Sequence, residues 1–346
     1  MKFGWAEFRS PKVSIVFSLI MFLLSGRSFA QQTAATNTAK DSSDKGANSA
    51  VAEQPHRTSR EDLNSLSIAD SDLHADPAFF GNKADYPVFT RELLQVQWRM
   101  ADPIDLWVIR PVGVAKPPVV LYLYSYPSET DRFRDDRYCE RVTKNGYAAV
   151  GFVSALTGHR YQNRPMKEWF VSELQESVVT SVHDVQMIIN YLATRGDFDM
   201  NQVGMFGQGS GGTIAILAAA VDPRIKAVDA LNPWADWPDW MAKSALIPEN
   251  ERPNYVKPEF QKKIAFFDPV LWLPKLTSQS VRIQDIASDT DTPEICKKEL
   301  EEVAPASVEV AKFDDDKAHF RAMVGGKVFD WIKDRLRFVA EPKSGA

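Results

Sequence analysis

Short runs of hydrophobic residues recur along most of this 346-residue chain, separated by segments with helical periodicity. The run 118–124 is apolar or aromatic throughout, which is typical of a strand that is buried on both faces of a sheet. Similar runs predict further buried strands at 147–154, 202–206, 225–231, 281–286 and 308–313. Residues 93–111 alternate between apolar and polar positions, so a strand pair that turns at Asp102-Pro103 is expected there.

Helical patterns lie between these strands. In residues 172–194 the apolar side chains are spaced three and four apart, so they form one hydrophobic face of a helix. An earlier helix ends at Lys144, just before the stop signal Asn145-Gly146. Further helices are expected at 213–221 and 324–338. Because strand and helix alternate, we predict an α/β fold with a doubly wound, mostly parallel sheet.

The N-terminal segment has the composition of a secretory signal peptide. Three basic residues precede the apolar stretch 13–24, and Ser28-Phe29-Ala30 provides a small-x-Ala cleavage site. The stretch is far shorter than the roughly 20 residues that a membrane-spanning helix needs. We therefore expect cleavage of residues 1–30, a secreted or periplasmic protein, and no remaining membrane span. An uncleaved anchor is the alternative.

A linker is expected to follow the signal peptide. Up to residue 60 the segment is rich in small and polar residues and contains scarcely any large apolar side chain. Such a segment buries too little surface to offset its ordering entropy. We predict a disordered linker over residues 31–71 and one folded domain over residues 72–340, a length that suits a single α/β domain.

Charge and cysteine content narrow the functional classes. The formal net charge is −5 and the basic residues are scattered, whereas nucleic-acid binding needs a basic patch or stripe. Cys139 and Cys296 either form a disulfide, which export permits, or are isolated buried thiols. Neither lies in a CxxC spacing, so zinc and thioredoxin-like sites receive no support.

The run 203–212, Val-Gly-Met-Phe-Gly-Gln-Gly-Ser-Gly-Gly, carries the most specific chemical signal. An apolar strand enters a glycine cluster and a small-residue helix leaves it, which is the sequence form of a nucleophile elbow. When the run is aligned to G-x-S-x-G with Gly207 and Gly211 as the flanking glycines, the nucleophile position holds Gly209. The hydroxyl of Ser210 comes one residue later.

Two registers of this elbow are open. The residues two before and two after the nucleophile must be small, because strand and helix cross closely there. With Gly209 in the nucleophile position, both of these neighbours are glycines. With Ser210 in that position, Gln208 would enter the crowded corner. Sterics favour the first register, which leaves no hydroxyl for a base to activate.

His319 and Asp289 are the candidate partners of a nucleophile. The chain order in this architecture is nucleophile, acid, histidine, and His319 lies between the last expected strand and the last helix. Asp289 is the favoured acid on the loop after the strand 281–286; Asp291 is second, and Asp285 also competes. The alternatives are that the aspartate only forms a turn and that His319 is a solvated loop residue.

An oxyanion hole would draw on two backbone N–H groups that point to the developing negative charge. One follows the nucleophile directly, which assigns Gly211 if Ser210 is the nucleophile. The other is expected from Tyr126, on the loop after the first buried strand.

Residues 232–280 interrupt the alternation of strand and helix. They contain Trp234, Trp237, Trp240, Phe260, Phe266, Phe267 and Trp272. The segment is either a cap whose aromatic side chains line a pocket or a helical excursion whose aromatics pack on the sheet edge. The cap is favoured, because the preceding strand ends where the site is expected.

These features resemble the α/β-hydrolase superfamily, nearest to its dienelactone hydrolase and acetyl xylan esterase branches. The similarity runs from about Leu93 to Phe338 and rests on the strand order, the elbow, the acid loop and His319. Tyr124 and Ser125 stand where His-Gly is usual, which narrows the approach to the site.

The resemblance implies two alternative functions. The first is an exported serine esterase that acts on a carboxylic ester through Ser210, Asp289 and His319, with no metal or other cofactor. The second is an exported binding or scaffold protein that holds an apolar small molecule. It follows from Gly209, because the N-myc-downstream-regulated proteins of the same superfamily also have glycine in place of the serine and are thought to be non-catalytic. The natural substrate and the oligomeric state stay open.

Overall fold

The computed structural model describes residues 61–100, 102–156, 170–326 and 329–336, all within one compact unit that spans residues 57–346. The expected signal peptide and residues 31–60 of the expected linker lie outside the described residues. In the described residues no helix is long and apolar enough to cross a bilayer.

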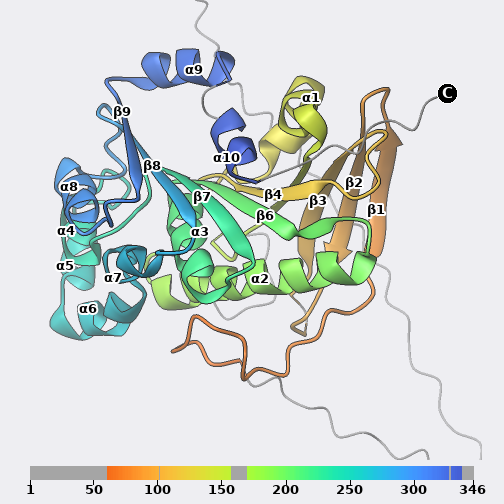
Figure 1. Ribbon diagram of the computed structural model, residues 1–346. Helices are drawn as coiled ribbons and strands as arrows, with labels where there is room; N and C mark the ends of the chain where they lie inside the picture. Colours follow the sequence, from red (N-terminus) through yellow and green to blue (C-terminus); the bar gives the residue numbers. More distant parts are fainter. Residues whose placement is uncertain (1–60, 101, 157–169, 327–328, 337–346) are drawn as a thin grey trace, which may run out of the picture. The chain divides into compact units, whose positions relative to one another are not determined.

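Nine strands in the described residues form one mixed sheet (Figure 1). Their order across the sheet is β1-β2-β3-β5-β4-β6-β7-β8-β9. The strands are β1 (Phe79–Asp85), β2 (Phe89–Val96), β3 (Ile104–Pro111), β4 (Pro118–Leu123), β5 (Ala148–Phe152), β6 (Asp199–Gln208), β7 (Ile225–Leu231), β8 (Ser280–Ile286) and β9 (Glu309–Phe313). The pairs β1–β2, β2–β3 and β3–β5 are antiparallel, and the five pairs that follow in this order, from β5–β4 to β8–β9, are parallel. This confirms the mostly parallel sheet.

Helices cover both faces of this sheet. In Figure 1, α1 (Asp136–Thr143) and α10 (Phe329–Arg335) lie above it, and α2 (Leu174–Arg195) and α3 (Ser210–Val221) lie below. Nearly every position of α3 is buried because it packs against β6, β7 and α2, which explains its small residues. This arrangement confirms the doubly wound α/β architecture and brings the β6–α3 turn to the carboxyl edge of a central strand.

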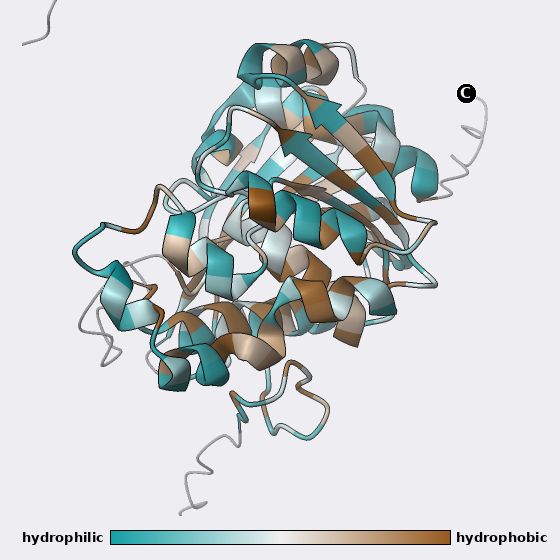
Figure 2. Cartoon of the chain, turned by 90° about the vertical axis from the view of Figure 1, so that its left-hand side faces the viewer, coloured by the Kyte–Doolittle hydropathy of each residue, from teal (hydrophilic) through white to brown (hydrophobic). Residues whose placement is uncertain are grey.

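The remaining helices are short. They are η1 (Asp131–Arg134), η2 (Lys144–Gly146), α4 (Trp237–Lys243), α5 (Arg252–Tyr255), α6 (Pro258–Ile264), η4 (Ala265–Phe267), α7 (Pro269–Trp272), η5 (Leu273–Lys275), α8 (Glu294–Glu302) and α9 (Asp316–Val324). Helices α4 to α8 form a group beside β8 (Figure 1). Figure 2 faces this group and shows hydrophilic and hydrophobic residues alternating along its helices, as amphipathic helices on a core should do.

The packed domain begins before residue 72. Leu66 and Leu73 are buried, and Gln186 of α2 donates a side-chain hydrogen bond to the carbonyl of Leu66 at 2.8 Å. Residues 61–71, assigned to the linker by composition, therefore belong to the folded domain, because a few apolar and charged side chains anchor an otherwise polar segment.

A buried ion network holds this segment in place. The Arg99 guanidinium is 2.5 Å from Glu61 and 2.5 Å from Asp184 of α2. His183 Nδ1 lies 2.7 Å from the same Glu61 carboxylate. Burial by itself would raise the pKa of Glu61, but the hydrogen bonds from His183 and Arg99 and the Arg99 charge outweigh it and lower that pKa to about 2.

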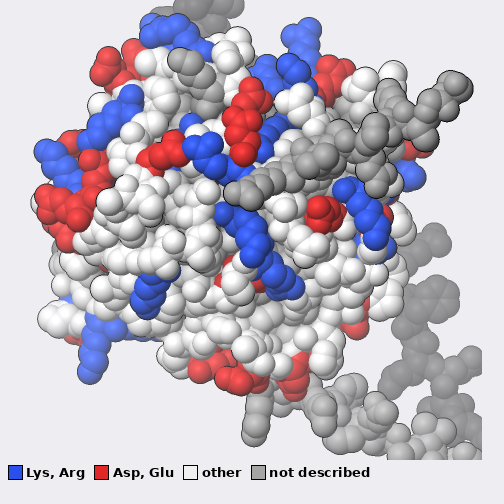
Figure 3. Space-filling view, in the orientation of Figure 1, with Lys and Arg blue, Asp and Glu red and all other residues white. Residues whose placement is uncertain are grey.

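Two further expectations concern the cysteines and the surface. Cys139 and Cys296 are both buried and free, so the alternative of isolated thiols holds and no disulfide joins them. Burial raises the pKa of the Cys139 thiol to about 11 and keeps it protonated. On the face in Figure 3, basic and acidic side chains are interspersed.

We expect Glu61→Gln to lower the free energy of unfolding by about 1–3 kcal/mol at pH 7, because the change removes the carboxylate that pairs Arg99 and His183. The folded-state pKa of Glu61 lies below its usual value of 4.5, so this stabilisation is present above pH 4.5 and is lost as the pH falls towards about 2. Urea denaturation at several pH values measures the difference. The exposed Glu302→Gln is the matched control, and a pH-independent difference would contradict the assignment.

Candidate functional site

The sharp turn between β6 and α3 is made by Gly209. Its φ of 53° and ψ of −120° lie in a region that residues with a side chain rarely adopt. Its N–H donates to the carbonyl of Leu231 at 2.8 Å, and its carbonyl accepts from the N–H of Thr213 at 3.1 Å. The strained position of the elbow geometry is thus occupied by a residue without a side chain.

The neighbouring glycines allow strand and helix to cross at backbone contact. A Cβ on Gly207 would lie less than 3.0 Å from the backbone of Gly211, and a Cβ on Gly211 would lie less than 3.0 Å from the Leu123 carbonyl of β4. Any larger residue at either position would push α3 away from the sheet. These contacts fit the register in which Gly207 and Gly211 flank Gly209.

The space above Gly209 is filled by groups from other elements. A Cβ built on Gly209 would lie less than 3.0 Å from Ser125 Oγ and Cβ, and 3.3 Å from Trp234 Nε1. Ser125 follows β4 and is partly exposed, so its hydroxyl stands where a nucleophile side chain would project. The sequence signal for this was the replacement of His-Gly by Tyr124-Ser125; nothing in the sequence indicated the role of Trp234.

Ser210, the residue after Gly209, is held inside the protein. It is the first residue of α3 and only 2% exposed. Its Oγ accepts the hydrogen bond of the Tyr126 N–H at 3.0 Å, so the donor expected in the oxyanion hole is bound to a side chain of the protein itself. The structure thus brings Ser210 and Tyr126 together. The Ser210 Oγ accepts the hydrogen bond that the oxyanion of a reaction intermediate would accept in an oxyanion hole.

His319 lies within α9 rather than on a loop, because the chain forms this helix ahead of the expected last helix, whose described part is α10. Its ring packs edge-on against Phe313 at 5.1 Å, and its buried Nε2 has no hydrogen-bond partner among the described residues. Burial lowers the pKa of His319, the nearby charge of Asp316 opposes this, and Arg132 and Arg282 lower it further. The imidazole is therefore mainly neutral at pH 7.

The acid candidates each take part in local structure. Asp289 Oδ1 accepts the N–H of Thr292 at 2.8 Å, so this carboxylate closes a turn after β8. The backbone carbonyl of Asp291 accepts hydrogen bonds from Trp240 and Ser244. No hydrogen bond joins His319 to Asp289 or Asp291, and the carboxylate whose charge acts on the imidazole is that of Asp316.

Asp285 differs from the other two because it lies within β8 and is 5% exposed. Burial, together with the nearby Glu301 carboxylate, raises the pKa of Asp285 to about 7. Asp285 pairs with Lys312 of the edge strand β9 and lies near Glu301 of α8. It is therefore a buried titrating group of the sheet, and no hydrogen bond joins it to His319.

The aromatic residues of the insertion form a core of their own. Trp234, Trp237, Trp240 and Phe267 are all at most 1% exposed. The rings of Trp234 and Trp240 are 4.9 Å apart, and those of Trp237 and Phe267 are 5.7 Å apart. A cavity of about 410 Å³ beside the insertion has no aromatic side chain in its lining. These four residues therefore pack as the alternative expects, whereas Phe260, Phe266 and Trp272 of the same insertion are partly exposed.

Comparison with known proteins identifies the fold to which this geometry belongs. A family profile described as X-Pro dipeptidyl-peptidase (S15 family) matches residues 102–261. Acetyl xylan esterase from Paenibacillus sp. R4 is similar in structure, with a TM-score of 0.58, 16% identity, and 79% of this chain and 92% of that chain covered. The chain is an α/β-hydrolase-fold protein.

Further α/β-hydrolases in solved structures have the same arrangement. Acetyl xylan esterase 1 from Thermoanaerobacterium sp. JW/SL YS485 gives a TM-score of 0.56 at 14% identity, over 74% of this chain and 88% of that chain. Acylaminoacyl peptidase from Pyrococcus horikoshii gives 0.53 at 13% identity, over 78% of this chain and 52% of that chain. No curated protein matches the chain in sequence. At these identities the likeness is one of fold.

We expect Gly209→Ala to cost about 2–4 kcal/mol of stability, because it adds both backbone strain and a contact with Ser125. Gly113→Ala is the matched control: it has a φ of +81° with nothing within 4 Å of its Cβ, so it reports strain alone, roughly 1 kcal/mol. In a Ser125→Gly background the cost of Gly209→Ala should fall. Urea unfolding of the double-mutant cycle measures this, and equal costs in both backgrounds would refute the contact.

Asp285→Asn should change the pH dependence of stability. The folded-state pKa of about 7 lies above the usual 3.8, so the protein is most stabilised by this group below pH 3.8 and loses that contribution as the pH rises through 7. The variant should therefore gain stability relative to the native chain between pH 5 and pH 8, as measured by urea unfolding. The exposed Asp314→Asn serves as control, and parallel curves for Asp285→Asn and the native chain would disprove the shift.

Proposed function

We propose that this exported α/β-hydrolase-fold protein binds a small molecule and does not form an acyl-enzyme at its elbow. The observation that carries the proposal is Gly209: the turn that lifts a nucleophile above the sheet holds no side chain. Acyl transfer through this fold needs a hydroxyl or thiol at that point, directed at both a base and an oxyanion hole. Here the hydroxyl of Ser125 and the indole N–H of Trp234 border the space instead.

Ser210 is a poor replacement for the missing nucleophile. A nucleophile must be reachable by the carbonyl carbon of the substrate, and Ser210 is only 2% exposed. It must also pass its proton to a base, whereas its Oγ contacts the N–H of Tyr126 and the His319 Nε2 has no partner. The burial and the hydrogen bond both favour a structural role in which Ser210 closes the oxyanion hole from inside.

Export is part of the proposal and rests on the N-terminal sequence. The basic residues before the stretch 13–24 and the small-x-Ala site that ends at Ala30 support cleavage and a secreted or periplasmic location. The polar composition of residues 31–60 supports a linker between the cleavage site and the domain.

Carboxylic ester hydrolysis through Ser210, Asp289 and His319 is the second candidate. Two observations favour it. The similar solved structures include acetyl xylan esterases and an acylaminoacyl peptidase, which supports hydrolysis as the general chemistry. In addition, the neutral imidazole of His319 keeps its buried Nε2 free of protein partners, as a general base requires.

Labelling with a fluorophosphonate probe, followed by peptide mapping, separates the two functions. We expect no adduct on the folded protein and no hydrolysis of p-nitrophenyl acetate above that of heat-denatured protein, because no reachable hydroxyl is paired with a base. An adduct on Ser210, together with activity that Ser210→Ala abolishes, would overturn the proposal. Ser128→Ala, which changes an exposed serine on the loop after β4, is the matched control and should leave any activity unchanged.

A further inference from the structure

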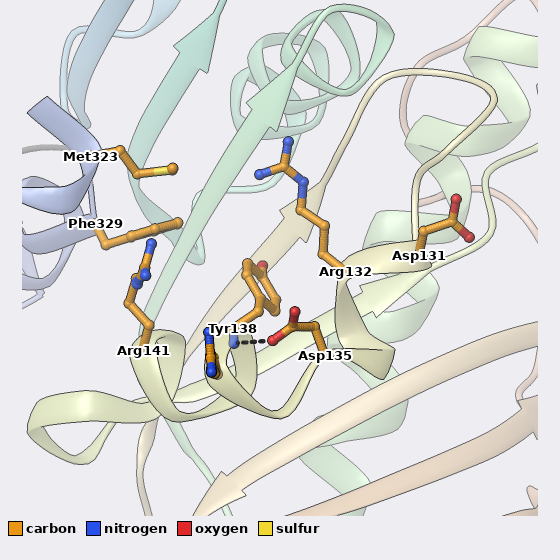
Figure 4. Close-up of a pocket in the computed structure, with 8 residues that line it drawn as sticks. Asp131, Arg132, Asp135, Tyr138, Arg141, Met323 and Phe329 are labelled. Carbon is orange, nitrogen blue, oxygen red and sulfur yellow. Dashed lines mark hydrogen bonds between the residues drawn. The ribbon is translucent and has the colours of Figure 1, made fainter. Parts of the chain in front are cut away.

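A cavity of about 470 Å³ lies between the first helices of the domain and its C-terminal helices. Its walls are formed by η1 and α1 on one side and by α9 and α10 on the other (Figure 4). The volume lies within the range of small-molecule sites. The side chains used below are Arg132, Arg137, Arg141, Tyr138, Met323 and Phe329.

Three arginines give this cavity its charge. No carboxylate in the described part of the chain lies within ion-pair distance of Arg132, Arg137 or Arg141. The Arg132 guanidinium lies over the Tyr124 ring, 4.4 Å from its centroid, and also hydrogen-bonds the Tyr124 hydroxyl, which limits its freedom and leaves its other N–H donors to a ligand. Figure 4 shows Arg132 and Arg141 extending from different elements on the side of the cavity that faces Met323 and Phe329, with the Arg132 guanidinium level with Met323 and the Arg141 guanidinium next to Phe329.

The two aspartates in the lining do not neutralise the arginines. Asp135 is the N-cap of α1, and its Oδ1 accepts the N–H of Tyr138 at 2.9 Å. Asp131 lies at the far end of the cavity and points away from Arg141 (Figure 4). With three arginines and two aspartates the lining carries one positive charge in excess, and no carboxylate of the described residues forms an ion pair with the three guanidinium groups.

The cavity also offers a neutral donor and an apolar wall. The hydroxyl of Tyr138 accepts a hydrogen bond from Tyr124 at 2.8 Å, so its own proton is available to an acceptor. Burial keeps the pKa of Tyr138 well above its usual value, and the group stays a donor. Met323 of α9 and Phe329 of α10 close the opposite side with thioether and aromatic surface.

The cavity adjoins the candidate site through α9. His319 and Met323 are four residues apart on this helix and therefore lie on the same face of it. The Arg132 charge acts on the His319 imidazole, and Tyr124, beneath Arg132, directly precedes Ser125 at the elbow. A molecule in this cavity would thus lie against the elements that surround the elbow.

We propose that the cavity binds a small organic anion whose carboxylate or phosphate group pairs with Arg132 and Arg141 and whose apolar part contacts Met323 and Phe329. Guanidinium groups suit both anions, because their paired N–H donors match the oxygens of either. The inference rests on the binding function proposed above and names the ligand class for it.

Isothermal titration with phenyl phosphate tests the proposal. The folded chain should bind phenyl phosphate, and Arg132→Gln and Arg141→Gln should each weaken binding by about tenfold or more through loss of a charge-assisted hydrogen bond. Arg134→Gln, an exposed arginine of η1 outside the lining, is the matched control and should change affinity less than about twofold. Benzoate in place of phenyl phosphate tells a carboxylate site from a phosphate site.

Two further probes define what would overturn the inference. Inorganic phosphate should bind more weakly than phenyl phosphate, and equal affinity would refute the role of Met323 and Phe329. Absence of binding by phenyl phosphate and benzoate, or equal binding by all three arginine variants, would refute the anion site itself. Hydrolysis of p-nitrophenyl acetate by the same samples is scored separately, because turnover would overturn the non-catalytic function and leave the anion site standing.

Discussion

The close crossing of β6 and α3 is the constraint on which the rest of the domain depends. A central strand meets a helix at backbone contact, and only glycine at positions 207 and 211 leaves room for the carbonyls that pass there. Because the helix must leave the strand at once, the connecting residue takes the positive φ found at Gly209. The positions of α3, of the β4 loop and of the tryptophan core above them follow from that turn.

The same turn explains why glycine is accommodated at the strained position of the elbow. Glycine fits its strained backbone better than serine does, so loss of the side chain costs no stability at that point. The vacated volume is bordered by Ser125 and Trp234, and the neighbouring Ser210 binds the Tyr126 N–H. Polar groups that would serve a reaction are thereby satisfied by one another, in keeping with the rule that buried donors find acceptors. A positively charged cavity beside His319 remains as the feature suited to a ligand.

Much of the fold was predictable because strands that are buried on both faces have continuous runs of hydrophobic residues. The strand expected at 225–231 is β7 residue for residue, and those expected at 281–286 and 308–313 differ from β8 and β9 by one residue at one end. Strand β1 was not expected, because all but one of its residues are exposed and its sequence does not alternate. The anchoring of residues 61–71 also escaped the pattern, since it depends on Glu61 meeting Arg99 and His183 from distant parts of the chain.

The sequence by itself determined the α/β architecture and the location of the elbow, because these depend on local periodicity and on the size of adjacent residues. Tertiary structure alone decided that Ser210 faces Tyr126, that Asp289 closes a turn instead of meeting His319, and that Trp234, Trp237 and Trp240 of the insertion pack together. It also brought three arginines from η1 and α1 opposite α9 and α10. Side-chain direction and long-range pairing depend on how elements far apart in the sequence pack, and no local pattern encodes them.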